Sequence, residues 1–408
     1  MNYSAVSTGI QPQSLLHGIN SESMDYDSST DSGELVDRLL GKLVESSFDT
    51  GKEFWPRGCI QEVITPMTIA EELNLRSSLV LYGAEKEDRT TLDALVDFIR
   101  DGSQKTFAIA LCCNLGGDKL FQAMNHFKNL NFKDSQLPIV GEHVKHIFYS
   151  STGRGYKIPW NSLSVRSFCS YQWSCLAPVF DDRNRKLALY SEEILPFTWA
   201  SPSGSSGTFG EVHRLTIHAG HQQNGAQVKC SPAPISLARA NICMVAGWKA
   251  DVAIKKLHGT HSEDEDIQRK LQAGWDKEVR AHIKMTALKN PNIIEFVAAV
   301  TRGHERYLMF EWADGGNLRE FWTRKPLLSR TLVRNVLFQL DGLAHALESM
   351  HSLNYRHGDM KPENILRVKT FGNNRPPMLD IGQLKICDMG LSKQHIMETR
   401  LREVATDT

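Results

Sequence analysis

The sequence lacks any excess of charge, since 47 lysines and arginines balance 47 aspartates and glutamates. This balance argues against a surface dedicated to nucleic acid, which normally shows a basic excess. The chain also lacks an apolar run of 18 residues, so no membrane-spanning helix is predicted. No lysine or arginine precedes Arg38, which excludes the basic start of a secretory signal peptide.

The sequence has no C-x-x-C pair among its eight cysteines, so zinc ribbons and dithiol redox sites are not expected. Free thiols of this kind are typical of a reducing compartment. We therefore expect a soluble intracellular protein, in the cytoplasm or the nucleus, that binds neither nucleic acid nor membrane.

The first 33 residues are predicted to be a disordered, acidic tail, because they contain eight serines and few aliphatic residues. Residues 34–193 are predicted to be a mostly helical module. Apolar residues recur at helical spacing from Leu35 to Val44, and again over 91–100, 105–113 and 118–129. Short strands are predicted over Ile147–Ser150 and Cys175–Phe180. No catalytic pattern occurs in the module, so we expect it to bind a protein partner or to regulate the rest of the chain.

A glycine-rich segment, Ser205–Val212, marks a change of character in the second half of the sequence. Glycines in a turn between two strands allow backbone N–H groups to approach phosphate oxygens closely. A flexible linker is the alternative interpretation of this segment.

A lysine ends the apolar run Val252-Ala253-Ile254-Lys255, where a buried strand would require an anionic partner for it. The helix predicted to begin at Trp275 offers Glu278 as that partner. A solvated lysine at the end of a strand is the simpler alternative.

The strongest pattern is the loop from His357 to Leu366, which contains Asp359, Lys361 and Asn364. These residues supply a base, a cation and an oxygen ligand for a metal within six positions. Downstream, an apolar run ends in Asp388, which is followed by Met and Gly. A second metal ligand is one interpretation of Asp388, and a simple turn is the other.

Together, in this order, the motifs resemble the catalytic domain of eukaryotic protein kinases of the serine/threonine type. The resemblance implies an α+β fold with a β-rich small lobe and a helical large lobe over residues 194–408. It also implies ATP and Mg²⁺ as cofactors and a protein as the substrate. Lys361, followed by Pro362 and Glu363, matches the serine/threonine-specific form of the loop.

The roles that the resemblance implies follow the kinase pattern. Asp359 matches the catalytic base, Lys361 the loop lysine, Lys255 the lysine that grips the phosphates, and Glu278 its helical partner. Asn364 and Asp388 match the two magnesium ligands. The remaining nucleotide-binding positions, which include the gatekeeper and hinge, are Ser205, Gly207, Phe209, Gly210, Val212, Ala253, Phe310, Glu311, Ala313 and Leu366.

The chain also departs from the kinase pattern. Insertions are predicted near 219–248 and 370–382, where residues that break regular structure gather. The sequence ends at Thr408, inside the expected activation segment, so we expect the kinase domain to be incomplete. The module resembles the N-terminal extensions of fungal kinase-domain proteins. A non-catalytic nucleotide-binding scaffold is the alternative function, whereas a small-molecule kinase is disfavoured by Lys361-Pro362-Glu363-Asn364.

Overall fold

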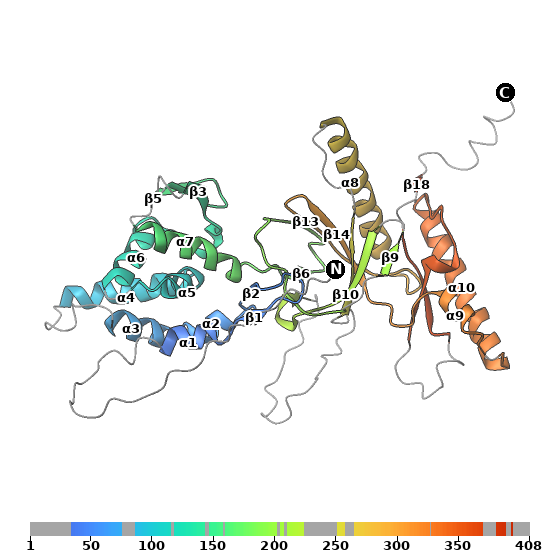
Figure 1. Ribbon diagram of the computed structural model, residues 1–408, viewed down its shortest axis with the longest axis horizontal. Coiled ribbons are helices and arrows are strands. Elements are labelled where there is room, and N and C mark those ends of the chain that lie inside the picture. The colour runs from blue at the N-terminus through green and yellow to red at the C-terminus, as the bar shows by residue number, and fades with distance from the viewer. Residues whose placement is uncertain are drawn as a thin grey trace, which may run out of the picture.

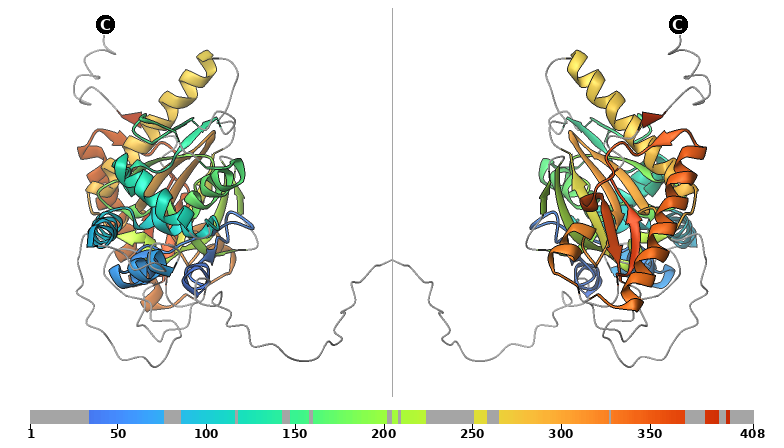
Figure 2. Two further views of the ribbon diagram at one scale, coloured as in Figure 1. Left: turned by 90° about the vertical axis from the view of Figure 1, so that its left-hand side faces the viewer. Right: turned by 90° about the vertical axis from the view of Figure 1, so that its right-hand side faces the viewer.

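The computed structural model has the α+β architecture, with the N-terminal module at one end and a β-sheet at the centre (Figure 1). Figure 2 shows the module helices facing the viewer from one end, and the C-terminal helices and hairpins from the other. The structure describes residues 34–75, 86–115, 118–142, 147–157, 160–201, 205–207, 210–223, 251–257, 265–326, 328–369, 381–388 and 393–394. The predicted acidic tail, most of both predicted insertions and the residues from 395 onwards lie outside these ranges.

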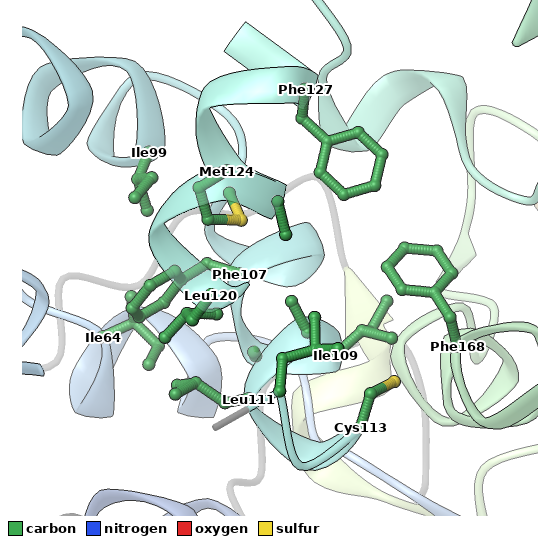
Figure 3. Close-up of a cluster of buried hydrophobic side chains, with 14 of the residues drawn as sticks. Ile64, Ile99, Phe107, Ile109, Leu111, Cys113, Leu120, Met124, Phe127 and Phe168 are labelled. Carbon is green, nitrogen blue, oxygen red and sulfur yellow. The ribbon is translucent and has the colours of Figure 1, made fainter. Parts of the chain in front are cut away.

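The module is built around α5 (Gln104–Cys112), whose residues 106–111 are all buried. Its sequence is apolar almost all round, which is typical of a helix enclosed by others. Figure 3 shows Phe107 and Ile109 among side chains from the surrounding helices. Those helices are α1 (Glu34–Leu40), α2 (Cys59–Val63), α3 (Pro66–Leu75), α4 (Lys86–Arg100), α6 (Asp118–Asn129) and α7 (Ser162–Tyr171).

The three apolar runs predicted as helices lie in α4, α5 and α6, and the strand predicted over Ile147–Ser150 is β4 (Ile147–Tyr149). The strand predicted over Cys175–Phe180 is wrong, because Cys175 ends a 3-10 turn and of these residues only Phe180 lies in a strand. The helix predicted to extend from Leu35 to Val44 ends earlier, at Leu40, because Gly41 follows and the chain turns. The other short elements of the module are β1 (Val44–Glu45), β2 (Glu53–Phe54), β3 (Val140–Glu142), β5 (Gly155–Lys157), β6 (Phe180–Asp181), β7 (Lys186–Leu189), and the 3-10 turns η2 (Asp134–Gln136) and η3 (Gln172–Cys175).

The central sheet has seven strands in the order β7-β13-β14-β12-β10-β8, with β9 paired to β10. All these pairs are antiparallel except β7 with β13, which is parallel. The strands from the second half of the chain are β8 (Phe197–Ala200), β9 (Ser205–Gly207), β10 (Gly210–Ile217), β12 (Asp251–Lys256), β13 (Phe296–Arg302) and β14 (Glu305–Glu311). These strands and α8 (Glu265–Ala287) form the small lobe.

Helix α8 packs against the sheet through Trp275 and Val279, which are buried against Phe296, Ala299 and Leu308. The helix begins ten residues before the predicted start at Trp275. Glu265 and Asp266 lie in its first turn, where acidic side chains are favourable next to the helix N-terminus.

The module and the small lobe share a core. The turn between β1 and β2 inserts Phe48 beside Phe197 and Tyr307, at centroid distances of 5.7 and 5.6 Å. The next residue, Asp49, accepts two hydrogen bonds from Arg302 Nη1 at 2.6 and 2.8 Å, and both side chains are over nine-tenths buried. The two parts of the chain are therefore one packed unit.

The large-lobe segment follows the sheet and contains two helices, α9 (Leu318–Thr323) and α10 (Arg330–Ser352). A hairpin of β16 (Ile365–Val368) and β17 (Gln383–Ile386) packs beside α10. The short remaining elements here are β15 (Tyr355–Arg356), η5 (Pro362–Asn364) and β18 (Lys393–Gln394). Near the module, η4 (Ala219–His221) leads to β11 (Gln222–Gln223), which pairs with β6.

Helix α10 exposes large apolar side chains along one face, with 62% of Leu337 and 73% of Phe338 accessible to solvent. Its opposite face buries Leu343, Ala346 and Met350 against the β16–β17 hairpin. Within the described ranges, no helix is long and apolar enough to cross a membrane.

Glu305 gives the small lobe a specific pH dependence. Burial alone would raise the pKa of Glu305, but hydrogen bonds from Lys256 and Tyr307 lower it from 4.5 to about 2. The stability contributed by ionised Glu305 is therefore complete above pH 4.5 and is lost as the pH falls towards 2. We expect Glu305→Gln to be less stable than the wild type at pH 6, and the difference to shrink to nothing near pH 2. Urea unfolding at each pH measures the difference in the free energy of unfolding, and the exposed Glu53→Gln is the control. A difference that stays the same at low pH would contradict the lowered pKa of Glu305.

Candidate active site

The glycine-rich segment forms the predicted hairpin. Strands β9 and β10 pair antiparallel, with Gly207 opposite Gly210 and Ser205 opposite Val212. The backbone of the hairpin thus lies at the edge of the small lobe. Thr208 and Phe209, at the tip, lie outside the described residues.

Strand β12 carries Lys255 inside the sheet, between β14 and β10. Lys255 lies opposite Val212 on β10, and Ala253 lies opposite Phe310 on β14. The ammonium Nζ of Lys255 lies 3.3 Å from Oδ1 of Asp388, and both side chains are mostly buried. Two residues separated by 133 positions are therefore brought together at one point.

Glu278 lies on α8 and is mostly buried, with 19% of its side chain exposed. The contact that the structure gives Glu278 is with His282, one turn along the helix, at 3.9 Å between Oε1 and Nε2. The carboxylate paired with Lys255 is that of Asp388. The structure thus places Glu278 on the expected helix without bringing it to Lys255.

The loop before η5 gathers the other predicted residues. Asp359 Oδ2 lies 2.7 Å from Lys361 Nζ and accepts a hydrogen bond of 3.0 Å from Asn364 Nδ2. The hydrogen bond from Lys361, the charge of that lysine and the bond from Asn364 hold the pKa of Asp359 below its usual range. The same contact raises the pKa of Lys361. Asp359 is therefore an ionised carboxylate at neutral pH, able to accept a proton.

Asn364 joins this loop to the strand that carries Asp388. Its backbone carbonyl accepts a hydrogen bond of 2.9 Å from the N–H of Cys387, immediately before Asp388. Its amide nitrogen donates to Asp359, so the amide oxygen is the atom left to ligate a cation. Asp388 itself has a φ of 62°, a left-handed conformation that turns the chain at the end of β17.

One amide and one carboxylate oxygen suit Mg²⁺, which binds few protein ligands and completes its shell with water and phosphate oxygens. Among the residues that the structure describes, no group of three or more His, Cys, Asp or Glu side chains could hold a metal by itself. The donor set thus fits a magnesium ion that arrives with a nucleotide better than a permanent metal centre.

The predicted hinge joins β14 to α9 and contacts the β16–β17 hairpin. Glu311 pairs with Lys385 of β17 and accepts a hydrogen bond of 2.9 Å from the N–H of Glu295. Gly315 N–H donates to Arg367 O at 2.8 Å, and a Cβ at Gly315 would lie 2.6 Å from the same oxygen. Only glycine permits this approach.

The other predicted nucleotide-binding residues flank these contacts. Ala313 is buried in the hinge, just after β14. Leu366 lies on β16, where it is paired with Lys385 of β17. Phe310 packs edge-on against His282 of α8, at a centroid distance of 4.8 Å. Phe310 therefore links the hinge to the helix that carries Glu278.

Two residues that hold the site together were not assigned a role from the sequence. His357 Nε2 donates to the carbonyl of Cys387 at 2.8 Å, and its Nδ1 accepts from the N–H of Asp359 at 3.3 Å. Asn292 Nδ2 donates to Leu384 O at 2.7 Å, which fixes β17 against the loop before β13. For His357, its position two residues before Asp359 was the feature of the sequence that could have indicated this role. For Asn292, the sequence offers no such feature.

Comparison with known proteins agrees with this geometry. The family model of the protein kinase domain matches residues 237–408. The C-terminal part of the chain is therefore similar to the catalytic domain of protein kinases. Curated proteins similar to the chain include serine/threonine kinases. The match begins at residue 237, but β10, which precedes it, pairs with β12 inside the match, and β8 pairs with β10.

Individual relatives match over limited segments. Cyclin-dependent kinase-like 4 of Mus musculus is 32% identical over 142 residues, which cover 35% of this chain and 35% of that protein. Serine/threonine-protein kinase 12 of Arabidopsis thaliana is 31% identical over 161 residues, covering 38% of this chain and 30% of that kinase. The chain thus spans about a third of the length of these relatives.

Proposed function

We propose that this protein is an ATP- and Mg²⁺-dependent serine/threonine protein kinase, with its domain beginning near residue 194. The observation that carries the proposal is one connected cluster. Lys255 contacts Asp388, and Cys387 beside it bonds to Asn364, which bonds to Asp359. A cation, a base and two oxygen ligands thus lie in one cluster, and phosphoryl transfer needs such a set for positioning and charge neutralisation.

In the proposed mechanism, the backbone of the β9–β10 hairpin and Lys255 bind the phosphates of ATP. Asn364 and Asp388 would hold Mg²⁺, which would supply positive charge to the phosphate oxygens. Asp359 orients the substrate hydroxyl and accepts its proton as the oxygen attacks the γ-phosphorus. The bond from that phosphorus to the bridging oxygen breaks, and ADP leaves. Lys361, beside Asp359, neutralises the transferred phosphoryl group.

The adenine base is proposed to lie between Val212 and Ala253 above and Leu366 below, with Phe310, Glu311 and Ala313 at its edge. We further propose that the protein acts inside the cell, in the cytoplasm or the nucleus, where its free thiols would stay reduced. Its substrate would be another protein.

The test uses the 408-residue chain and thermal unfolding with and without Mg·ATP, together with phosphotransfer to casein. We expect ligand-dependent stabilisation that is lost in Lys255→Met and Asp388→Asn, because binding to the folded state raises the unfolding temperature. Lys256→Met, one residue along β12 and paired with Glu305 instead, is the matched control and should keep the stabilisation.

A non-catalytic nucleotide-binding scaffold is the second candidate, favoured by the position of Glu278 next to His282. Stabilisation by Mg·ATP without any phosphotransfer would support the scaffold. An unfolding temperature that Mg·ATP leaves unchanged would contradict both functions.

A further inference from the structure

A cavity of about 370 Å³ lies where the N-terminal module meets the segment that follows β10. Its walls come from regions far apart in the sequence, which include the turn from β2 to α2 with Arg57, the first turn of α5 with Lys105, and η4 with His221. Protein interiors contain few voids larger than a water molecule, so a hollow of this size needs walls that resist collapse. Ligand pockets have this size and occur preferentially at such junctions. We call it the junction cavity.

Hydrogen bonds to neighbouring segments hold the walls of the junction cavity in place. The indole N–H of Trp55 donates to Leu39 O at 2.8 Å, and its backbone N–H donates to Ser174 O at 2.8 Å. Lys105 is held from the other side, because its Nζ donates to Cys175 O at 2.8 Å. The cavity is therefore formed before any ligand arrives, which lowers the cost of binding.

His221 forms another wall of the cavity and carries no charge. Its Nδ1 lies 2.9 Å from Pro178 O, and Nδ1 holds the proton because a carbonyl oxygen can only accept. Its Nε2 then accepts the backbone N–H of Arg57 at 3.1 Å. Burial lowers the pKa of His221, which agrees with a neutral ring. Both ring nitrogens are thus occupied, so His221 shapes the cavity and leaves the binding of a polar group to other residues.

Lys105 is the charged group that the cavity offers to a ligand. Within the described ranges, its ammonium donates to Cys175 O and forms no ion pair, so two of its three N–H groups remain to bind an anion. No aspartate or glutamate of the described residues lines the cavity. The nearby carboxylate of Asp134 accepts the backbone N–H groups of Lys105 and Thr106, both at 2.9 Å, and burial raises its pKa. The cavity thus has a cationic wall without an opposing carboxylate.

The rest of the lining is mostly apolar. Trp55, Ile60 and Val179 supply most of this surface. Arg57 lies at the exposed rim, where its guanidinium donates to Gln223 Oε1 at 2.7 Å. A free phosphate ion would need several donors and would gain nothing from apolar walls, whereas a molecule with an apolar body and one anionic group uses both parts of the lining.

We propose that the junction cavity binds a small aromatic carboxylate. The ring of the ligand packs against Trp55, and its carboxylate accepts hydrogen bonds from Lys105. The volume lies at the lower end of the range for ligand pockets, so the ligand has one ring or two fused rings. The site is formed by other residues than the candidate active site, and the proposal does not depend on the proposed kinase function.

The test is calorimetric titration of the 408-residue chain with naphthoate and with its neutral analogue naphthamide. We expect both to bind, and naphthoate to bind about tenfold more tightly, because a charge-assisted hydrogen bond to Lys105 is added. Lys105→Met should weaken naphthoate binding by about tenfold and leave naphthamide binding unchanged. The carboxylate and the lysine would then account for the same gain in affinity.

Lys119→Met, which removes an exposed lysine from α6, is the matched control and should keep both affinities. Lys255→Met should keep them too, because Lys255 belongs to the candidate active site. Ala177 also lines the cavity, so Ala177→Phe should fill it and abolish the binding of both compounds. Urea unfolding of Ala177→Phe checks that this variant still folds.

Equal naphthoate affinity in Lys105→Met and the wild type would overturn the proposal, and so would a wild type that binds no naphthoate in the millimolar range. Binding that Lys255→Met removes would overturn it as well, because the compound would then occupy the candidate active site. Displacement of naphthoate by inorganic phosphate at equal concentration would show that the cavity takes a bare anion instead. If Ala177→Phe does not fold, the comparison of the two compounds across Lys105→Met still decides.

Discussion

Asp359→Asn is expected to lower kcat for phosphotransfer by about 10²- to 10⁴-fold while Mg·ATP affinity changes little. Asparagine has almost the same shape, and its amide oxygen still accepts the hydrogen bond from Asn364. It cannot take up a proton, however, and it loses the charge that attracts Lys361. Initial rates with a protein substrate and the Kd for Mg·ATP, measured on the same samples, separate the two effects.

The exposed Asp341→Asn on α10 removes a carboxylate outside the candidate site and should leave both quantities unchanged. The base assignment fails if Asp359→Asn keeps its kcat. It also fails if affinity and rate fall together, since Asp359 would then serve nucleotide binding.

Asp49→Ala is expected to destabilise the unit formed by the module and the small lobe by about 3 kcal/mol. Removing one partner of a buried ion pair leaves the other charge without compensation. Asp49 also accepts a hydrogen bond of 2.8 Å from the N–H of Leu195, which would be left without its acceptor. We expect a loss at the lower end of the range for broken buried ion pairs, because Glu305 still lies 3.4 Å from Arg302 and partly compensates its charge. Thermal unfolding should shift down by about 5 °C.

The double variant Asp49→Leu with Arg302→Met should recover much of this loss, because two apolar side chains of similar size require no solvation. The exposed Asp93→Ala on α4 is the control and should change stability by less than about 0.5 kcal/mol. A loss below 1 kcal/mol in Asp49→Ala would show that the pair does not hold the two parts together.

The sequence was informative where the chemistry lies within a few positions. Asp359, Lys361 and Asn364 are close in the chain, so their meeting in space follows from one short loop. The helices of the module followed from apolar periodicity, because each buries one face or more. Apolar periodicity did not predict the end of the first helix, because Leu43 and Val44 continue the apolar pattern beyond Gly41, where Val44 begins a strand.

Contacts between distant segments could not be predicted in this way. Nothing near Asp49 in the sequence indicates Arg302 as its partner, and nothing near Lys186 indicates a place in the sheet of β13. The strand is only four residues long and alternates weakly, so its burial depends on the surface that it meets. The predicted division near residue 194 therefore crosses a shared core, in which Phe48 packs with Phe197 and Tyr307.

The pairing of Asp49 with Arg302 also determines the order in which the protein can fold during synthesis. The two residues are 253 positions apart. At about 5–20 residues per second, Phe48 and Asp49 leave the ribosome roughly 10–50 s before their partners do. Helices α1 to α7 contact one another locally and can assemble in that interval, but an aromatic ring and a carboxylate remain exposed on the growing chain. We expect slow translation between residues 200 and 300 to lengthen this exposure and to increase the dependence of the nascent chain on chaperones.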